Sequence, residues 1–375
     1  MPEINKPGKR VLVAMSGGVD SSTTVALLKD KGYEVIGANM RLWYREKDEE
    51  LASQNAKGCC SLEAANDARR VADKLEIPFY VLNFKEIFYQ KVVKDFIDEY
   101  MRGRTPNPCI VCNKYLKWQK FLQKAFELGC DYIATGHYAR IKFDHVYDRY
   151  LLYRSVDEKK DQTYMLYNMD QKELSRTLFP LGDYDKFKTR KLAEKYGLIT
   201  SNKPESQDIC FIPDNDYRSF IAEESGQEIN PGPIITVEGK KVGEHKGIPF
   251  YTIGQRKGLG VSLGKPKYVV KMDLEKNAVI IGDKEDLLTR EFVAEGVNWI
   301  PFDSIDKEIR VEAKIRYNTP PVPSKVIPQK DKKQVKVVFD EPEEAVTPGQ
   351  AVVFYDGNMV LGGGTIEENL QDSYY

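Results

Sequence analysis

The sequence has no long apolar run, few cysteines and almost no histidine. None of its hydrophobic stretches approaches the roughly 18 residues that a membrane-spanning helix requires. The first ten residues carry charges and two prolines rather than an apolar stretch, so we expect no secretory signal. Six cysteines among 375 residues are too few for a disulfide-stabilised secreted scaffold. We therefore expect a protein of the reducing cytoplasm, where neighbouring cysteines would be catalytic, redox-active or metal-bound.

Neither sign of charge is in excess. The 56 Lys and Arg and the 57 Asp and Glu give a formal net charge of −1, which provides no global attraction to nucleic acid or membranes. Hydrophobic residues at 41% and charged residues at 30% are typical of a folded globular chain. The charge is uneven locally, because residues 314–336 include seven basic residues and one acidic residue. A solvated face is the more common reason for such a run, and a nucleic-acid surface is the alternative.

The chain changes character near residue 213, and less sharply near 285. Before residue 213, short apolar runs alternate with segments of helical periodicity, which predicts an α/β fold with a parallel sheet covered by helices. After it, glycine and proline become frequent and short β-branched runs predict β-structure. The expected strands cover 11–15, 33–40, 77–84, 132–135, 234–237, 268–271, 278–281, 335–339 and 351–354. The expected helices cover 20–31, 61–75, a segment containing Val92, Phe96 and Tyr100, and 115–128, with an irregular loop over 105–109.

A segment rich in glycine and serine joins the first expected strand to its helix. Residues 16–22 read Ser-Gly-Gly-Val-Asp-Ser-Ser. Two glycines allow backbone N–H groups to turn towards an anion, and the helix N-terminus adds a partial positive charge. The Gly-Lys-Ser/Thr ending of a Walker loop is missing, so γ-phosphate transfer of that type is not expected. The segment predicts a pyrophosphate-binding turn, and a glycine turn without a ligand is the alternative.

This segment resembles the loop of the PP-loop ATP pyrophosphatase superfamily. Members of that superfamily hold the pyrophosphate of ATP while an acceptor attacks the α-phosphorus. The resemblance implies ATP and Mg²⁺ as cofactors, with Asp20 in contact with the metal or the pyrophosphate.

Two cysteines lie in polar surroundings 98 residues apart. Cys112 directly precedes the expected 115–128 helix and lies beside Lys114, and both a helix N-terminus and a lysine lower the pKa of a thiol. Cys210 lies between a polar and an apolar stretch. One thiol could carry a persulfide sulfur while the other attacks it or resolves the resulting disulfide. A buried structural role for each cysteine is the alternative.

These segments and others resemble the tRNA-specific 2-thiouridylase family over nearly the whole chain. The strings that carry the resemblance lie at 14–21, 105–108, 112–113, 134–138, 160–162, 179–182, 206–210, 247–260, 316–317 and 348–350. The resemblance implies a PP-loop catalytic domain with a Rossmann-like sheet over 1–212, a central adaptor domain over 213–284 and a tRNA-contacting β-barrel over 285–375. It also implies ATP-dependent 2-thiolation of the wobble uridine in the tRNAs for lysine, glutamate and glutamine. Uridine would be adenylated first, and AMP and pyrophosphate would be released.

The resemblance also implies roles for individual residues. Cys210 would carry a persulfide received from a cysteine desulfurase or a sulfur-relay protein. Cys112 would be the catalytic nucleophile, with a transient disulfide between the two. The implied ATP-binding residues are Ala14, Met15, Ser16, Gly17, Gly18, Val19, Asp20, Ser21, Met40 and Gly136. The implied tRNA contacts are Asn107, Pro108 and Cys109 beside the target base, together with His137, Lys160, Asp161, Gln162, Arg316, Tyr317 and Gln350.

One position departs from part of the family. Some members carry an aspartate where this chain has Cys109, so Cys109, Cys112 and Cys210 form a possible set of three thiolates. Such a set could hold an iron–sulfur cluster with one iron open to sulfide, which is the alternative to the persulfide route. Cys59 and Cys60 could join a zinc site with the 109–112 pair, although this is a minor alternative. Cys130 precedes a buried strand and is expected in the core.

Two other functions are compatible with the loop alone. One is a PP-loop amidotransferase or ligase acting on a small metabolite without tRNA. The other is an RNA-binding protein whose loop no longer catalyses a reaction. The paired cysteines favour sulfur transfer over both.

Overall fold

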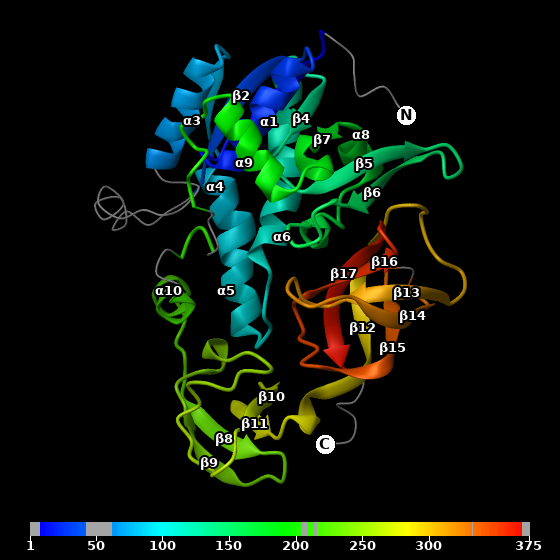
Figure 1. The fold of residues 1–375 in the computed structure, drawn as a ribbon. Coiled ribbons are helices and arrows are strands. Elements are labelled where there is room, and N and C mark those ends of the chain that lie inside the picture. Colours follow the sequence, from blue (N-terminus) through cyan, green and yellow to red (C-terminus); the bar gives the residue numbers. More distant parts are fainter. Residues whose placement is uncertain (1–7, 43–61, 205–208, 213–215, 332, 370–375) are drawn as a thin grey trace. The chain divides into compact units, whose positions relative to one another are not determined.

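The computed structural model describes residues 8–42, 62–204, 209–212, 216–331 and 333–369. The chain forms two compact units (Figure 1). One comprises residues 1–92, 109–215 and 358–360, and the other comprises 93–108, 216–357 and 361–375. Of the helices in the described ranges, none combines the length and the apolarity needed to cross a membrane.

A five-stranded parallel sheet forms the centre of the first unit. Its strand order is β3-β2-β1-β4-β7, and every neighbouring pair is parallel. The strands are β1 (Arg10–Ala14), β2 (Glu34–Arg41), β3 (Phe79–Asn83), β4 (Tyr132–Ala134) and β7 (Thr177–Leu178). This confirms the predicted α/β class, since parallel strands need helices to cover both faces.

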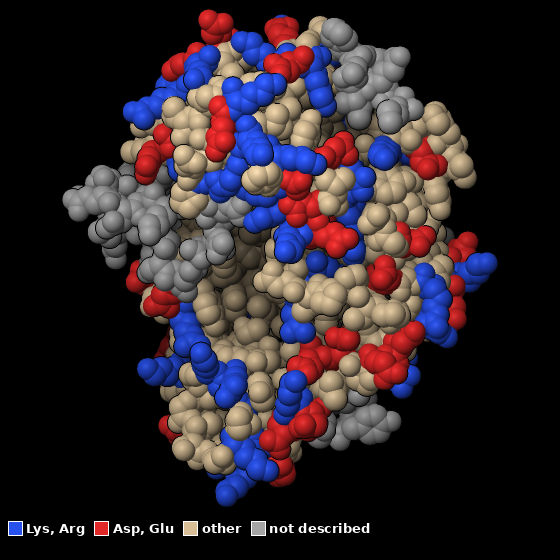
Figure 2. Space-filling model, in the orientation of Figure 1, with Lys and Arg blue, Asp and Glu red and all other residues tan. Residues whose placement is uncertain are grey.

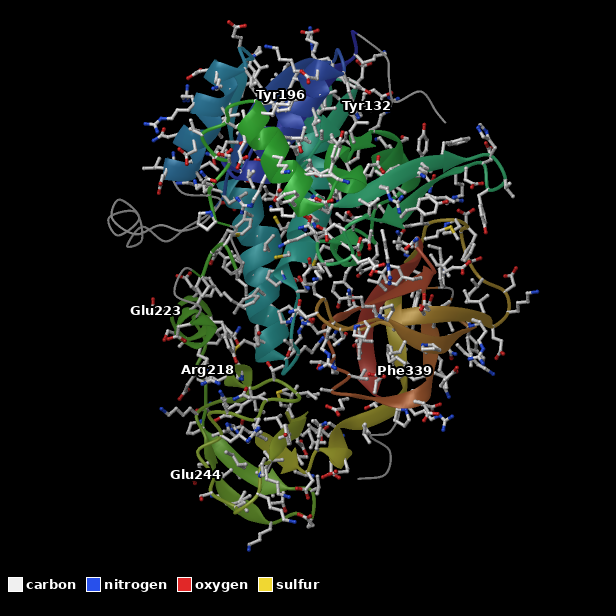
Figure 3. All side chains as sticks on the ribbon, viewed as in Figure 1. Tyr132, Tyr196, Arg218, Glu223, Glu244 and Phe339 are labelled. Atoms are coloured by element: carbon white, nitrogen blue, oxygen red, sulfur yellow. The ribbon has the colours of Figure 1, made fainter. Side chains whose placement is uncertain are left out.

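Helices α1 (Val19–Asp30), α3 (Leu62–Lys74) and α9 (Lys186–Lys195) belong to the same unit. Val11 and Val13 of β1 are fully buried and form one apolar cluster with residues of α1 and α3, including Val25 and Val71. Tyr132 and Tyr196, labelled in Figure 3, pack partly buried against this cluster. The unit also contains α8 (Gln171–Ser175), the 3-10 turns η3 (Thr163–Met165) and η4 (Pro180–Asp183), and the antiparallel hairpin of β5 (Ala139–Asp144) and β6 (Arg149–Arg154).

Two long helical segments contain π-helical stretches, which are frequent at functional sites. The first comprises α4 (Lys85–Phe88), η1 (Tyr89–Val93) and α5 (Lys94–Met101), and the second comprises α6 (Pro108–Cys112), η2 (Asn113–Phe121) and α7 (Leu122–Glu127). The helix predicted over 115–128 is present, but its predicted start at residue 115 and the irregular loop predicted through residue 109 were wrong. The helix begins at Pro108, because proline is well tolerated in the first helical turn, where its missing N–H has no partner to lose. Cys112 is therefore inside the helix rather than before its N-terminus.

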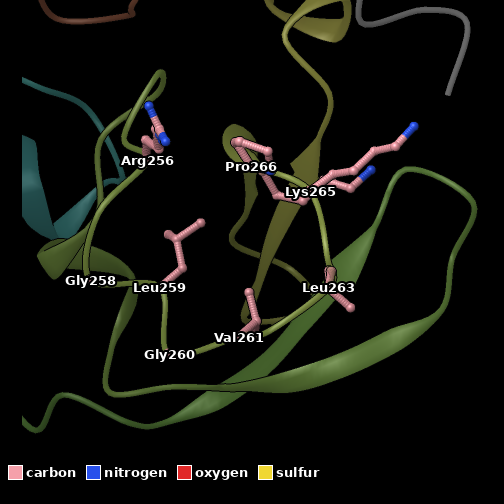
Figure 4. A pocket seen from close by; sticks show the side chains of 9 residues that line it. Arg256, Gly258, Leu259, Gly260, Val261, Leu263, Lys265 and Pro266 are labelled. Atoms are coloured by element: carbon pink, nitrogen blue, oxygen red, sulfur yellow. The ribbon is translucent and has the colours of Figure 1, made fainter.

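The second unit contains a small sheet and a barrel. The small sheet has the order β10-β11-β8-β9, with strands β8 (Gly232–Thr236), β9 (Lys241–His245), β10 (Tyr268–Asp273) and β11 (Ala278–Gly282). Helix α10 (Tyr217–Glu224) precedes it and was not predicted. The 3-10 turns η5 (Ile248–Phe250) and η6 (Glu285–Leu287) complete this region. A pocket of about 200 Å³ lies beside the sheet and includes the basic residues Arg256, Lys265 and Lys267 (Figure 4).

The barrel confirms the predicted C-terminal architecture. Its strands follow the order β12-β15-β14-β13-β16-β17, and β12 also pairs with β17, which closes the sheet. The strands are β12 (Leu288–Trp299), β13 (Ile309–Lys314), β14 (Val322–Pro328), β15 (Val335–Glu344), β16 (Ala351–Asp356) and β17 (Met359–Asn369). Phe339, labelled in Figure 3, is buried inside with its ring centroid 5.4 Å from that of Phe292.

Candidate active site

The loop after β1 leads directly into α1 and leaves the first turn of that helix open. Gly18 is the N-cap residue and supplies no side-chain hydrogen bond to the helix. The hydroxyls of Ser21 and Ser22 instead donate to the carbonyl oxygen of Gly18, at 3.2 and 2.8 Å. Ser16 is exposed, and its backbone N–H donates to Ser21 Oγ at 3.2 Å. An uncapped helix N-terminus beside exposed serine is a suitable site for an anion such as pyrophosphate.

Two glycines in this region are required by close packing. Gly17 has φ +71°, and a Cβ added there would lie 2.1 Å from the carbonyl oxygen of Ala64. Gly136, which follows β4, has no room for a side chain either, because a Cβ would lie 2.9 Å from backbone atoms of Asp20 and Ser21. The loop therefore packs against α3 on one side and against the end of β4 on the other.

The expected ATP-binding residues are brought together by the sheet. Ala14 ends β1, Met40 is the next-to-last residue of β2, and Gly136 follows β4, so all three lie at the carboxyl ends of adjacent parallel strands. Ligands of open α/β sheets bind at this edge. Met15 is buried at the start of the loop, and its carbonyl oxygen accepts from Nδ2 of the buried Asn39 at 2.8 Å. Val19 is buried as well, as the first residue of α1.

Asp20 is the acidic group of the loop, and two residues hold its carboxylate. Lys186 Nζ donates to both carboxylate oxygens at 2.7 Å, and the Tyr138 hydroxyl donates to Oδ1 at 2.9 Å. The side chains of Asp20 and Lys186 are 30% and 13% exposed, so the pair is only partly screened by water. A carboxylate in this position is an oxygen ligand of the kind that Mg²⁺ prefers, and the lysine supplies positive charge for phosphate oxygens. The residues present therefore fit a magnesium–nucleotide ligand.

The sequence contained no signal for Lys186. It lies 166 residues from Asp20, at the start of α9, and only the tertiary structure brings the two together. Tyr138 was part of a string already noted, but its contact with Asp20 could not be read from that string.

Cys112 and Cys210 belong to the same unit, and both are half-buried. Their neighbours contact one helical segment. Phe211, adjacent to Cys210, packs edge-on against the buried Phe88, with the ring centroids 5.5 Å apart. Lys91 Nζ, one turn further along that segment, lies 5.4 Å from the ring centroid of Tyr115, which follows Cys112 by three residues. The two cysteine segments thus converge on residues 88–91.

The iron–sulfur alternative finds no support in this geometry. Cys109 is exposed and Cys112 half-buried. Within the described residues, no three or more His, Cys, Asp or Glu side chains come together in a way that could hold a metal ion. Cys59 and Cys60, on which the zinc alternative depends, lie outside the described residues. Cys130 is in the core as expected, and burial raises the pKa of its thiol to about 11.

Of the residues expected beside the target base, Asn107 and Pro108 belong to the second unit, and the residues just before them are anchored there. Gln350 Nε2 donates to the carbonyl oxygens of Thr105 and Pro106 at 2.7 and 3.3 Å. The backbone N–H of Thr105 in turn donates to the carbonyl oxygen of Pro348 at 2.9 Å. Gln350 therefore holds the chain just before Asn107 and Pro108.

His137 is buried rather than on the surface. Its Nδ1 lies 2.7 Å from Thr135 Oγ1, and its Nε2 lies 3.3 Å from Lys117 Nζ. Burial and the Lys117 ammonium hold the pKa of His137 well below 6.5. Because an ammonium can only donate, Nε2 must be the acceptor, so the ring is neutral with its proton on Nδ1.

The three residues at 160–162 differ in their exposure. Lys160 is half-buried. Asp161 is buried, and its carboxylate accepts from Ser155 N at 3.0 Å and from Thr163 Oγ1 at 2.6 Å. Gln162 is half-buried, and its Oε1 accepts from the backbone N–H of Tyr138 at 3.0 Å.

The positive charge of the basic run at 314–336 is partly neutralised by nearby carboxylates. Lys325 pairs with Glu308 at 3.5 Å, and Lys336 pairs with Glu291 at 2.7 Å. Arg316 donates to the carbonyl oxygen of Glu344 at 2.9 Å. Tyr317 is half-buried, and its ring centroid lies 5.6 Å from Lys314 Nζ. On the face shown in Figure 2, lysine and arginine alternate with aspartate and glutamate rather than forming one basic surface.

Comparison with known proteins identifies the family. Three family models match in sequence: a tRNA methyl transferase HUP domain over 9–214, a tRNA methyl transferase PRC-barrel domain over 218–283 and an aminomethyltransferase beta-barrel domain over 289–366. The tRNA-specific 2-thiouridylase MnmA of Natranaerobius thermophilus is 59% identical over 95% of this chain and 97% of that protein. The proteins of the same name from Carboxydothermus hydrogenoformans and Clostridioides difficile are 55% and 51% identical over 96% of this chain, and 98% and 99% of their own lengths.

The chain belongs to the tRNA-specific 2-thiouridylase family. The resemblance drawn from the separate sequence strings is thereby confirmed. Because the relatives are matched over nearly their whole length, membership of the family extends to all parts of the chain, including the small sheet and the barrel.

Proposed function

We propose that this protein catalyses the ATP-dependent 2-thiolation of the wobble uridine in the tRNAs for lysine, glutamate and glutamine. The observation that carries the proposal is the combination, in one unit, of an anion-binding loop and two cysteine segments that converge on residues 88–91. Adenylation and sulfur transfer require these two parts together. The names of the curated relatives support the same activity for this chain.

The first step in this proposal is activation of the uridine. Its O2 attacks the α-phosphorus of ATP and pyrophosphate leaves, so that C2 now carries adenylate as its leaving group. The backbone N–H groups of residues 17–21 hold the pyrophosphate, with Lys186 beside them. Asp20 is the residue that would hold Mg²⁺, which would supply charge neutralisation for the departing pyrophosphate.

The second step transfers sulfur. The terminal sulfur of a persulfide on Cys210 bonds to C2, and AMP leaves with the original O2. Cys112 then attacks the Sγ of Cys210, which breaks the sulfur–sulfur bond and releases 2-thiouridine. This step leaves a Cys112–Cys210 disulfide on the protein, which an external thiol must reduce before the next turnover. A cysteine desulfurase or sulfur-relay protein renews the persulfide.

The proposal assigns the remaining expected residues to tRNA. Asn107, Pro108 and Cys109 border the extruded base. The tRNA-contacting set also includes His137, Lys160, Asp161, Gln162, Arg316, Tyr317 and Gln350. Gln350 contributes by holding the backbone at residues 105–106, just before Asn107. Residues 1–212 form the catalytic domain, 213–284 an adaptor and 285–375 the tRNA-contacting barrel of a cytoplasmic enzyme.

Reconstitution with purified components tests this function. The protein, ATP, a persulfide donor and unmodified glutamate tRNA are incubated, and the digested nucleosides are analysed by mass spectrometry. We expect one 2-thiouridine per tRNA and equal amounts of AMP and pyrophosphate. Thiolation that proceeds without ATP, or ATP cleavage without tRNA thiolation, would contradict the proposal.

A further inference from the structure

Residues 104–106 directly precede the segment expected beside the target base, and the end of helix α5 sets their course. Gly103 has φ +67°, and its N–H donates to the carbonyl oxygen of Tyr100 at 2.9 Å. The N–H of Arg104 donates to the carbonyl oxygen of Glu99 at 2.9 Å. These two bonds form a Schellman motif, which ends the helix at a glycine and brings the following residue back beside the last turn.

The side chain of Arg104 joins the end of α5 to the barrel. Its Nε donates to Glu99 Oε2 at 2.7 Å, and its Nη1 donates to Glu367 Oε2, on β17, at 2.6 Å. The Arg104 side chain is only 16% exposed, so water and salt screen these two ion pairs weakly. Burial and a hydrogen bond with Glu367 raise the pKa of Glu295, on β12. Arg104 thus supplies positive charge among carboxyl groups from the helix and from two barrel strands.

The small sheet and the barrel also hold the next residue, Thr105. Its Oγ1 donates at 3.2 Å to Oγ1 of Thr252, which follows η5. On the barrel side, Gly349 has φ +90°, and a Cβ added there would lie 2.9 Å from Thr105 N and 3.1 Å from Arg104 Cβ. Residues 104 and 105 are therefore fixed by side-chain bonds and by close backbone packing within the second unit.

The link from Arg104 to the base-bordering residues is short and stiff. Asn107 follows after two residues, and Pro106 and Pro108 each fix one backbone dihedral angle. Pro108 also begins α6, the helix that contains Cys112. A shift of Arg104 relative to the barrel would consequently be passed on to Asn107 and Pro108 rather than absorbed in between.

We propose that Arg104 is a positioning residue for thiolation, whose ion pairs with Glu99 and Glu367 fix Asn107 and Pro108 relative to the barrel. The inference rests on the proposed function, because it takes the barrel as a part that holds the tRNA and residues 107 and 108 as neighbours of the target base. With Arg104 in place, both parts meet the tRNA in one arrangement. Without it, the two carboxylates lose the cation between them and repel each other. A displacement of roughly 1 Å at a reacting group can cost about 10²-fold in rate.

Steady-state thiolation of glutamate tRNA separates positioning from binding. In Arg104→Ala, kcat should fall about 10- to 100-fold, while the KM for tRNA and the Kd for Mg·ATP stay within about threefold of wild type. Arg104→Lys keeps the charge but lacks the planar fork that serves both carboxylates, so its kcat should lie between those of wild type and Arg104→Ala. Circular dichroism and Mg·ATP binding establish that each variant is folded.

Glu367→Ala tests the same contact from the barrel and leaves the pair of Arg104 with Glu99 in place. It should lower kcat with the same small effect on KM, and it decides the question if Arg104→Ala does not fold. Because both substitutions break one contact, the double variant should be no more than about twofold slower than Arg104→Ala alone.

Arg102 provides the matched control. It pairs with the same Glu99, at 3.6 Å, but its side chain is 69% exposed, so Arg102→Ala should keep kcat within about twofold of wild type. Wild-type kcat in folded Arg104→Ala or Glu367→Ala would overturn the inference, as would an equal loss in Arg102→Ala. A loss that appears as a higher KM for tRNA would also overturn it, because Arg104 would then act in binding. If wild-type protein thiolates the tRNA in the same assay, the proposed function survives each of these results.

Discussion

Replacing Gly17 by alanine should damage the nucleotide loop far more than replacing its neighbour Gly18. Gly17 has φ +71° and packs against the backbone of α3, where a new Cβ would lie 2.1 Å from the Ala64 carbonyl oxygen and 2.8 Å from its carbon. At Gly18 φ is −95°, and a Cβ would meet only Ser16 Oγ, at 3.5 Å. The two substitutions add the same methyl group at adjacent positions, so their difference isolates the packing and the backbone conformation.

The magnitude follows from these two terms. An alanine at positive φ costs about 1–2 kcal/mol. The contact with Ala64 must also lengthen by roughly 1 Å, and a backbone carbonyl in a packed helix cannot yield that distance without further cost. Together we expect about 2–4 kcal/mol of strain, which the loop relieves by leaving its anion-binding conformation. Since about 1.4 kcal/mol is a factor of ten, the affinity for ATP should fall at least tenfold in Gly17→Ala.

Isothermal titration with Mg·ATP measures the effect, and circular dichroism establishes that each variant is folded. Gly18→Ala should bind ATP within about fivefold of wild type, because alanine is less favourable than glycine at an N-cap by no more than about 1 kcal/mol. Wild-type affinity in a folded Gly17→Ala protein would refute the reasoning. An equal loss in both variants would also refute it.

Other predictions concern the cysteines, the buried histidine and the barrel anchor. Cys112→Ser and Cys210→Ser should each lower the thiolation rate by more than about 10²-fold while ATP binding, measured by calorimetry, survives. For His137, the unfolded chain takes up a proton below about pH 6.5 that the folded chain refuses, because its pKa is held well below that value. The contribution of neutral His137 to the free energy of unfolding is therefore complete above pH 6.5, and it falls by up to about 1.4 kcal/mol for each pH unit below that value. His137→Asn should consequently flatten the fall in melting temperature between pH 7 and 5. Gln350→Ala removes two hydrogen bonds to residues 105–106, and amide exchange of Thr105 followed by mass spectrometry should accelerate about two- to tenfold.

Each of these has a control in the same chain. Cys130→Ser changes a buried core thiol and should leave thiolation within a fewfold of wild type, whereas full activity of either active-site serine variant would exclude the two-thiol mechanism. A pH profile of melting that is identical in wild type and His137→Asn would show that His137 is not the titrating group. Unchanged exchange at Thr105 in Gln350→Ala would mean that the anchor does not hold that segment.

The sequence was most informative where burial is continuous. Strands β1, β2 and β4 of the parallel sheet were predicted because they are largely buried and read as apolar runs, as with Val11 to Val13. Strand β7 was missed because it has only two residues, Thr177 and Leu178, which is too short for a recognisable apolar run. Several barrel strands were missed because only alternate residues face the interior, a weaker pattern that β13 shows over Ile309–Lys314. In β14, Pro323 and Pro328 argue against a strand by themselves, although the structure accommodates both.

The site was predictable in its parts but not in its connections. The loop at 16–22 and the two cysteines carry local chemical patterns that sequence alone reveals. The ion pair of Asp20 with Lys186 joins residues far apart in the chain, and no local pattern reports it. The same holds for the hydrogen bond from the Tyr138 N–H to Gln162 Oε1, which also joins separate segments of the chain. The helix start at Pro108 was mispredicted because two prolines close together favour a loop, while one of them is also suited to a first helical turn.

The fate of one oxygen atom tests the central claim most directly. A glutamate tRNA is synthesised with oxygen-18 at O2 of the wobble uridine and thiolated by the protein with ATP and a persulfide donor. If that oxygen attacks the α-phosphorus before sulfur enters, the AMP recovered by mass spectrometry will carry one oxygen-18 for each 2-thiouridine formed. AMP without the label, with oxygen-18 in water instead, would contradict activation of the uridine by adenylation.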